Sequence, residues 1–164
     1  MNFFSRMIIL IKSNRIEKGS VGMDQETPVH IYVKSVIREG SDTETIEFRT
    51  TGFYYMKKDK IYLSYHEEHD AGKVKTIVKA SENEVLVMRS GAIEMKQRFR
   101  PGSRTVTHYK MPFGRLELGV DTKAVSVTHQ PPDGKISIEY DMIVSDEQKH
   151  LHKMSISYRG GHES

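Results

Sequence analysis

Cysteine is absent from the 164-residue chain. Disulfides, thiolate nucleophiles and metal ions held by thiolates are therefore excluded. Tryptophan is also absent, and no apolar run approaches the roughly 18 residues that a membrane-spanning helix needs. Because a chain without disulfides suits a reducing compartment, we expect a cytoplasmic protein with no membrane partner.

Residues that favour helices are scarce. Leucine and alanine together number only 10, whereas isoleucine and valine together number 27. Side chains branched at Cβ lose rotamer freedom in a helix and fit the pleated surface of a sheet. The composition therefore predicts a sheet protein, and the length suits one domain with a hydrophobic core.

Most of the chain carries no excess of basic residues, although the net charge is +3. Residues 1–22 hold four basic residues and one acidic residue, so they account for the whole excess. A nucleic-acid interface needs basic side chains clustered on one face of the folded domain. We therefore expect no nucleic-acid partner.

Residues 1–22 differ from the remainder and are interpreted as an N-terminal extension of a domain over residues 23–164. Their apolar residues have helical spacing, but the longest apolar run, Met7–Ile11, is too short for a secretion signal. One interpretation is a short amphipathic helix that plugs a barrel end or docks on a partner. The other, which we favour, is a native start at Met23, because Glu17–Ser20 can be encoded by a purine run resembling a ribosome-binding site.

Alternation with a period of two dominates the sequence from residue 29 onward. Within residues 93–99 the odd positions are Ile, Met, Gln and Phe, and the even positions are Glu, Lys and Arg. About ten such stretches begin near residues 29, 46, 61, 74, 85, 93, 105, 116, 136 and 154, with the eighth continuing over Val125 and Val127. Turn-forming segments separate them, and no helical period follows residue 23.

Ten short strands joined by short turns predict an antiparallel meander. An open sheet with one apolar face would leave its edges exposed, whereas closure removes them. We therefore expect an all-β fold, a single closed up-and-down β-barrel of 8–10 strands, with a sandwich as the alternative.

The face predicted to point into the barrel carries polar as well as apolar residues. A barrel filled only for stability would hold valine, isoleucine and leucine, because buried polar groups need partners. Arg89 faces inward if Val85 and Val87 do, and it would then meet an anionic or carbonyl group of a ligand. The candidate ligand-binding residues are Arg89, Tyr65, Gln97, Tyr109, Thr107 and Tyr140. The alternative is an architectural polar network.

Three function classes follow from this interior. We favour a non-enzymatic barrel, with no cofactor and no catalytic residue, that binds a small amphipathic or anionic molecule. No nucleophile elbow or phosphate-binding loop is present. The second interpretation is an enzyme that uses Arg89 with Tyr65 or Glu67. The third is a structural or interaction protein with a filled barrel and an exposed apolar patch. That patch would comprise Leu86, Met88 and Phe53.

Two histidine-containing segments are considered as metal sites. His66 and His69 lie three residues apart, whereas the helical metal motif places two histidines four apart. We interpret residues 66–70 as an acidic, solvated hairpin loop. His150 and His152 share one face of a strand without a carboxylate in register, which predicts a surface pair. We therefore expect no metal site.

Five segments together carry a family resemblance. They are Gln25–Val29, Ile46–Tyr55, Tyr62–Asp70, Val87–Gly91 and Tyr140–Met142. These segments resemble the YwiB-like family of uncharacterised bacterial β-barrel proteins, found largely in Gram-positive bacteria. The resemblance spans roughly residues 23–162 and supports Met23 as the start. It implies a calycin-type barrel related in shape to lipocalins and fatty-acid-binding proteins, and it implies no activity.

Overall fold

The computed structural model describes residues 26–69, 72–145 and 148–160, and all ten elements in these ranges are strands. They are β1 (Thr27–Glu39), β2 (Asp42–Lys57), β3 (Lys60–His69), β4 (Gly72–Ser81), β5 (Glu84–Gly91), β6 (Met95–Phe99), β7 (Arg104–Met111), β8 (Gly114–Gln130), β9 (Asp133–Ser145) and β10 (Gln148–Gly160). The expectations for residues 1–22 and for a start at Met23 lie outside the described residues.

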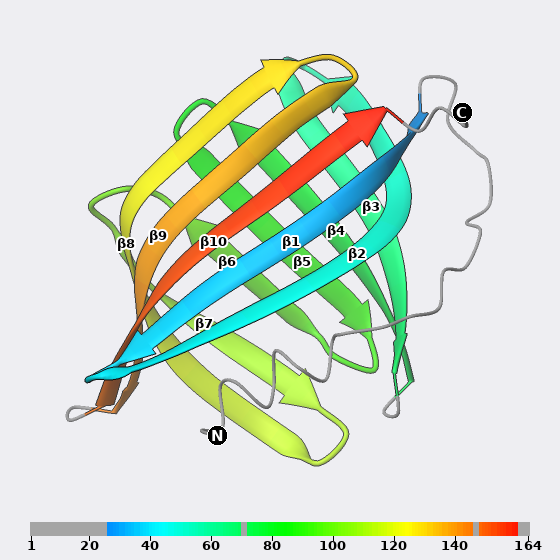
Figure 1. The fold of residues 1–164 in the computed structure, drawn as a ribbon. Helices are drawn as coiled ribbons and strands as arrows, with labels where there is room; N and C mark the ends of the chain where they lie inside the picture. Colours follow the sequence, from blue (N-terminus) through cyan, green and yellow to red (C-terminus); the bar gives the residue numbers. More distant parts are fainter. Residues whose placement is uncertain (1–25, 70–71, 146–147, 161–164) are drawn as a thin grey trace.

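The strands form one antiparallel sheet in the order β6-β5-β4-β3-β2-β1-β10-β9-β8-β7. Figure 1 shows β9, β10, β1 and β2 crossing the near side of a barrel, with β4, β5 and β6 behind them. The ends of the sheet meet at one bridge, where Glu94 and Lys110 exchange two 2.9 Å backbone hydrogen bonds. The barrel is therefore nearly closed, and the predicted all-β barrel fold is confirmed, while its calycin type stays a prediction.

Alternate side chains of the strands fill the barrel. In β1, every odd-numbered residue from Val29 to Ile37 is buried, and none of the residues between them is. This pattern removes one apolar face from water and leaves the other face solvated. The eighth predicted stretch is also confirmed as one strand, because β8 continues to Gln130 past a register shift between Thr122 and Ala124.

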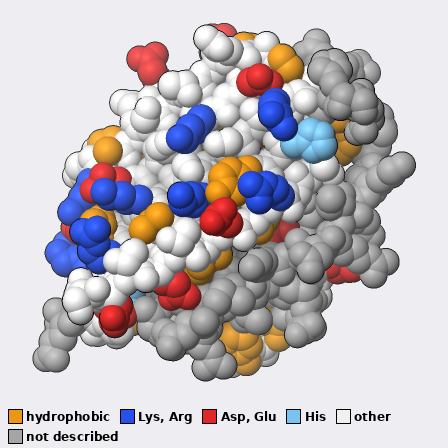
Figure 2. All heavy atoms as spheres, in the orientation of Figure 1, with side chains coloured by type: hydrophobic (Ala, Val, Ile, Leu, Met, Phe, Trp, Pro, Cys, Tyr) orange, Lys and Arg blue, Asp and Glu red, His pale blue; other side chains and the backbone are white. Residues whose placement is uncertain are grey.

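The outer surface on the near side carries charges of both signs. Figure 2 shows lysine and arginine side chains lying among acidic and uncharged ones on this face. Nothing helical in the described part of the chain is long and apolar enough to cross a membrane.

The apolar patch expected of an interaction barrel is not formed by the predicted residues. Leu86 is buried, and Met88 and Phe53 are half-buried. Lys79 and Arg98 lie directly opposite Leu86 on the two neighbouring strands, and the aliphatic stems of such long side chains cover apolar surface. The large apolar residues that are exposed lie elsewhere. They are Met56, Val106 and Phe113.

Candidate functional site

A row of directly paired residues crosses the inner face of four strands. Tyr65 of β3 pairs with Thr76 of β4, Thr76 with Arg89 of β5, and Arg89 with Met95 of β6. Opposed residues in antiparallel strands project from the same face of the sheet. Tyr65, Thr76 and Met95 are buried and Arg89 is half-buried, so the row points into the barrel. Strand β5 thus has the orientation on which the prediction for Arg89 depended.

The other four predicted residues also lie on the inner face. The Tyr109 hydroxyl donates a 2.9 Å hydrogen bond to Gln97 Oε1, which links β7 to β6. Thr107 of β7 and Tyr140 of β9 are buried as well. The positive charge of Arg89 acts on both Tyr109 and Tyr140, which indicates that all three side chains face the same interior space. The structure therefore brings together residues from distant strands of the sheet.

The inner tyrosines are held in their neutral form. Burial raises the pKa of Tyr109 to about 12, and it also raises the pKa values of Tyr65 and Tyr140. The positive charge of Arg89 lowers each of these pKa values in part. At neutral pH the three hydroxyls can therefore donate as well as accept hydrogen bonds.

Glu67 lies inside the barrel, which corrects the interpretation of residues 66–70 as a solvated loop. Strand β3 continues to His69, so Glu67 stays on the face of Tyr65 and is only 2% exposed. Burial raises the pKa of the Glu67 carboxyl to about 8, and the positive charge of Arg89 partly opposes this shift. Arg89, Tyr65 and Glu67, the residues of the enzyme interpretation, therefore share one environment.

His150 and His152 are fully buried, which corrects their prediction as a surface pair. The rings of Tyr140 and His152 stack at 4.9 Å, and the Tyr140 hydroxyl lies 3.3 Å from His152 Nδ1. Burial, together with His150, lowers the pKa of His152 to about 3, so its ring is neutral at pH 7. Ile156 and Tyr158 were predicted to point inward, and His150 and His152 lie an even number of residues before them on the same strand. This spacing was the sequence signal for the burial of the two histidines.

The two buried histidines do not form a metal centre with a third ligand. His150 Nε2 lies 3.5 Å from Glu39 Oε2, and the His150 and His152 ring centroids are 6.4 Å apart. Across the three described ranges, no three histidine or acidic side chains converge as a metal site would require.

A third histidine bridges two tyrosines of the barrel wall. The hydroxyls of Tyr54 and Tyr158 each lie 3.0 Å from a different ring nitrogen of His129. The two tyrosine rings also stack at 5.5 Å. This cluster joins β2, β8 and β10. Because each ring nitrogen of His129 contacts a tyrosine hydroxyl, the histidine has little hydrogen-bonding capacity left for a ligand.

Several inner side chains hold buried polar atoms without a hydrogen-bond partner among the described residues. A buried donor or acceptor without a partner costs about 1–3 kcal/mol. These atoms belong to strands β3 and β5 to β8. They are Glu67 Oε1 and Oε2, Arg89 Nε, Gln97 Nε2, Thr107 Oγ1 and Thr122 Oγ1. Sequence reasoning assigned Glu67 to a solvated loop and missed Thr122.

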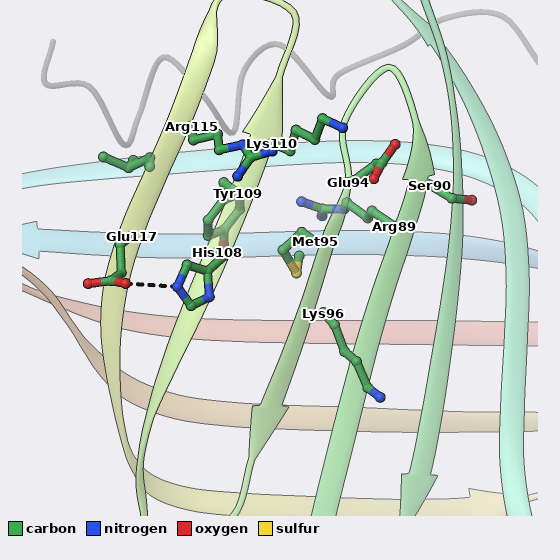
Figure 3. Close-up of a pocket in the computed structure, with 11 residues that line it drawn as sticks. Arg89, Ser90, Glu94, Met95, Lys96, His108, Tyr109, Lys110, Arg115 and Glu117 are labelled. Carbon is green, nitrogen blue, oxygen red and sulfur yellow. Dashed lines mark hydrogen bonds and ion pairs between the residues drawn. The ribbon is translucent and has the colours of Figure 1, made fainter.

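A cleft of about 600 Å³ lies beside the β6–β7 seam. Its lining combines inner residues, Arg89, Met95 and Tyr109, with exposed residues such as Lys110 and Arg115. Figure 3 shows Arg89 extending from β5 toward Tyr109 behind this opening. The cleft therefore connects the outer surface with part of the inner polar set.

Comparisons with known proteins agree with the fold. The profile of a domain of unknown function, DUF1934, matches residues 31–156. The chain is 61% identical over 139 residues to the "Uncharacterized beta-barrel protein YwiB" of Bacillus subtilis (strain 168), covering 85% of this chain and 98% of that protein. The crystal structure of the ywiB protein from Bacillus subtilis superposes with a TM-score of 0.78 at 58% identity, over 85% of this chain and 96% of the other.

Proposed function

The chain belongs to the DUF1934 family of domains of unknown function, and from its inner polar residues we propose that it binds a small molecule inside the barrel without converting it. The observation that carries the proposal is the set of unpartnered polar atoms on Glu67, Arg89, Gln97 and Thr107. A ligand bearing polar groups would form hydrogen bonds with these atoms and offset the free energy that their burial costs.

The inner surface suits a ligand that is partly apolar. Buried aliphatic side chains such as Val87, Leu118 and Ile138 lie among the polar ones. The tyrosines present an aromatic ring and a hydroxyl to the same space. An amphipathic molecule of modest size therefore fits the proposal best.

Native mass spectrometry of the freshly purified protein tests the proposal directly. We expect a mass excess over the polypeptide that disappears on denaturation and identifies a co-purifying small molecule. Recovery of the bare polypeptide from several growth conditions, together with no binding in the methyl experiment below, would refute it.

Methionine methyl NMR locates the bound molecule. Met142 and Met95 are buried in the barrel, whereas Met56 is 40% exposed and serves as the matched control. Adding the co-purified molecule, or members of a small-molecule library, should shift the Met142 and Met95 methyl signals and leave Met56 in place. Shifts confined to Met56 would place the binding outside the barrel and contradict the proposal.

Glu67 favours a second candidate function, an enzyme on the same scaffold. A carboxyl with a pKa near neutrality exchanges protons efficiently at physiological pH, and Arg89 and Tyr65 stand beside it. Incubation of the co-purified molecule with wild-type protein, followed by mass spectrometry, distinguishes the two functions. Chemical conversion of the molecule by the wild type, lost in Glu67→Gln while binding is retained, would establish catalysis. Recovery of the molecule unchanged from the wild-type protein would establish binding alone.

We also propose that the protein acts in the cytoplasm, since its cysteine-free chain needs no oxidising compartment. Fractionation of the native host tests this location. Recovery outside the soluble cytoplasmic fraction would contradict it.

A further inference from the structure

The cleft beside the β6–β7 seam carries more positive than negative charge. Four cationic side chains line it, those of Arg89, Lys96, Lys110 and Arg115, against the two carboxylates of Glu94 and Glu117. Glu117 is engaged with His108, whose Nε2 lies 2.7 Å from its Oε2. None of the four cationic groups lies within 4.0 Å of a carboxylate in the part of the chain that the structure describes.

Two of these cations are placed against each other. Lys110 of β7 and Arg115 of β8 are direct cross-strand partners, and both side chains are exposed. Like charges in directly opposed positions destabilise a sheet, so their neighbourhood attracts a compensating anion. On its other side, Lys110 pairs with Glu94. The row of Glu94, Lys110 and Arg115 therefore carries one excess positive charge.

Arg89 continues the positive charge inward. Figure 3 shows Arg115 and Lys110 beside Tyr109, Arg89 extending toward Tyr109 from the opposite strand, and Lys96 pointing away. The same Arg89 guanidinium acts on Tyr65 and Glu67 deeper in the barrel. Its Nε is buried and has no hydrogen-bond partner among the described residues.

We propose that this cleft is the entrance to the interior site and that it selects a small organic anion, attracted at the rim by Lys110 and Arg115 and bound by Arg89. The inference rests on the proposed function, because it names the ligand class and the route for the same interior site. The anionic head, whether carboxylate, sulfonate or phosphate, meets the guanidinium, which binds planar and tetrahedral oxyanions. The apolar remainder of the ligand lies between Met95, Tyr109 and the aliphatic barrel lining.

Two fluorescent probes with the same aromatic skeleton test the selection. The anionic probe is 1-anilinonaphthalene-8-sulfonate, and N-phenyl-1-naphthylamine is its neutral counterpart. We expect the sulfonate to bind the wild-type protein about tenfold more tightly, with an affinity that falls as salt is added. Methionine methyl NMR confirms that each probe shifts Met95 and leaves Met56 unchanged.

Charge reversal at the rim tests the route. The double variant Lys110→Glu with Arg115→Glu changes exposed side chains only, and we expect it to lower sulfonate affinity about tenfold while neutral-probe affinity changes less than twofold. Lys57→Glu with Lys58→Glu is the matched control, because it makes the same change of charge on exposed residues outside the cleft, and it should change neither affinity appreciably. Arg89→Gln should lower sulfonate affinity as well, and if that variant does not fold, the rim pair carries the test alone.

The outcomes separate the two proposals. If both probes shift the Met95 signal and bind with equal affinity, the anion entrance is refuted and interior binding stands. The same conclusion follows if charge reversal at the rim lowers the affinity for both probes by the same factor. If neither probe nor octanoate nor octyl phosphate shifts an interior methionine, interior binding fails and the entrance fails with it. Octanoate and octyl phosphate also show which anionic head is preferred.

Discussion

The Tyr109 hydroxyl donates a 2.9 Å hydrogen bond to Gln97 Oε1 across the seam where the two ends of the sheet meet. Both side chains are buried, and their strands share no ladder of backbone hydrogen bonds comparable to the other strand pairs. The Glu94–Lys110 bridge and this side-chain bond hold the same region of the barrel together. The inner polar residues thus contribute to closure as well as lining the candidate site.

Tyr109→Phe should therefore destabilise the protein and loosen the seam. The substitution leaves Gln97 with neither its carbonyl nor its amide nitrogen paired among the described residues, a loss of about 1–3 kcal/mol. Urea unfolding measures this loss, and faster amide hydrogen exchange at Lys110 reports the opening of the seam. Tyr62→Phe is the control, because its half-buried ring stacks on Tyr55 and its hydroxyl makes no hydrogen bond with another described residue. Equal effects of the two variants would contradict a role in closure.

Glu67→Gln should stabilise the protein progressively as the pH rises. The folded pKa of about 8 lies above the ordinary value of 4.5, so the folded state binds the proton more tightly than the unfolded chain. This contribution to stability is complete below pH 4.5 and is lost as the pH rises through about 8. The advantage of the glutamine variant should grow by on the order of 3 kcal/mol from pH 5 to pH 8.5.

Urea unfolding of both proteins across this range measures the growing difference. At pH 5 both side chains are neutral in the folded state, so the difference measured there is the baseline and serves as the control. A constant difference from pH 5 to pH 8.5 would contradict the raised pKa.

His152→Gln should resist acid better than the wild type. The folded pKa of about 3 lies below the ordinary value of 6.5, so His152 stabilises the fold above pH 6.5 and this stability is lost as the pH falls. Between pH 6.5 and pH 5 the wild type should lose on the order of 2 kcal/mol that the glutamine variant keeps. Unfolding curves at pH 7.5 set the baseline for the substitution itself, and parallel pH profiles would contradict the prediction.

Gly52→Ala should disrupt the wall of the site. A Cβ at Gly52 would collide with the backbone carbonyl of Ser64 and would lie 2.9 Å from Tyr65 Cβ. Because backbone cannot yield as a flexible side chain does, we expect a loss of about 3 kcal/mol or more, or failure to fold. Thr51→Ala, at the half-buried neighbouring position, is the control and should cost less than about 1 kcal/mol. Similar melting temperatures for both variants would show that the strands can separate here.

The inner position of the six candidate residues was predictable because a strand repeats every two residues. Once Val85 and Val87 are placed inward, Arg89 follows, and the same parity carries Gln97 and Thr107 into the barrel. The burial of Glu67 was not predicted, for a different reason. The charged run around it is typical of a turn, and only the length of β3 shows that the alternation continues through it.

The alternating chain by itself determined the strands, their apolar faces and the antiparallel meander, because period-two burial is local and every turn lies between consecutive strands. Tertiary structure alone decided where the strands end, and with that the burial of Glu67. It also decided which distant side chains meet, such as Tyr109 with Gln97 and Lys110 with Arg115. Register and closure set these pairings, and they depend on the packing of all ten strands at once.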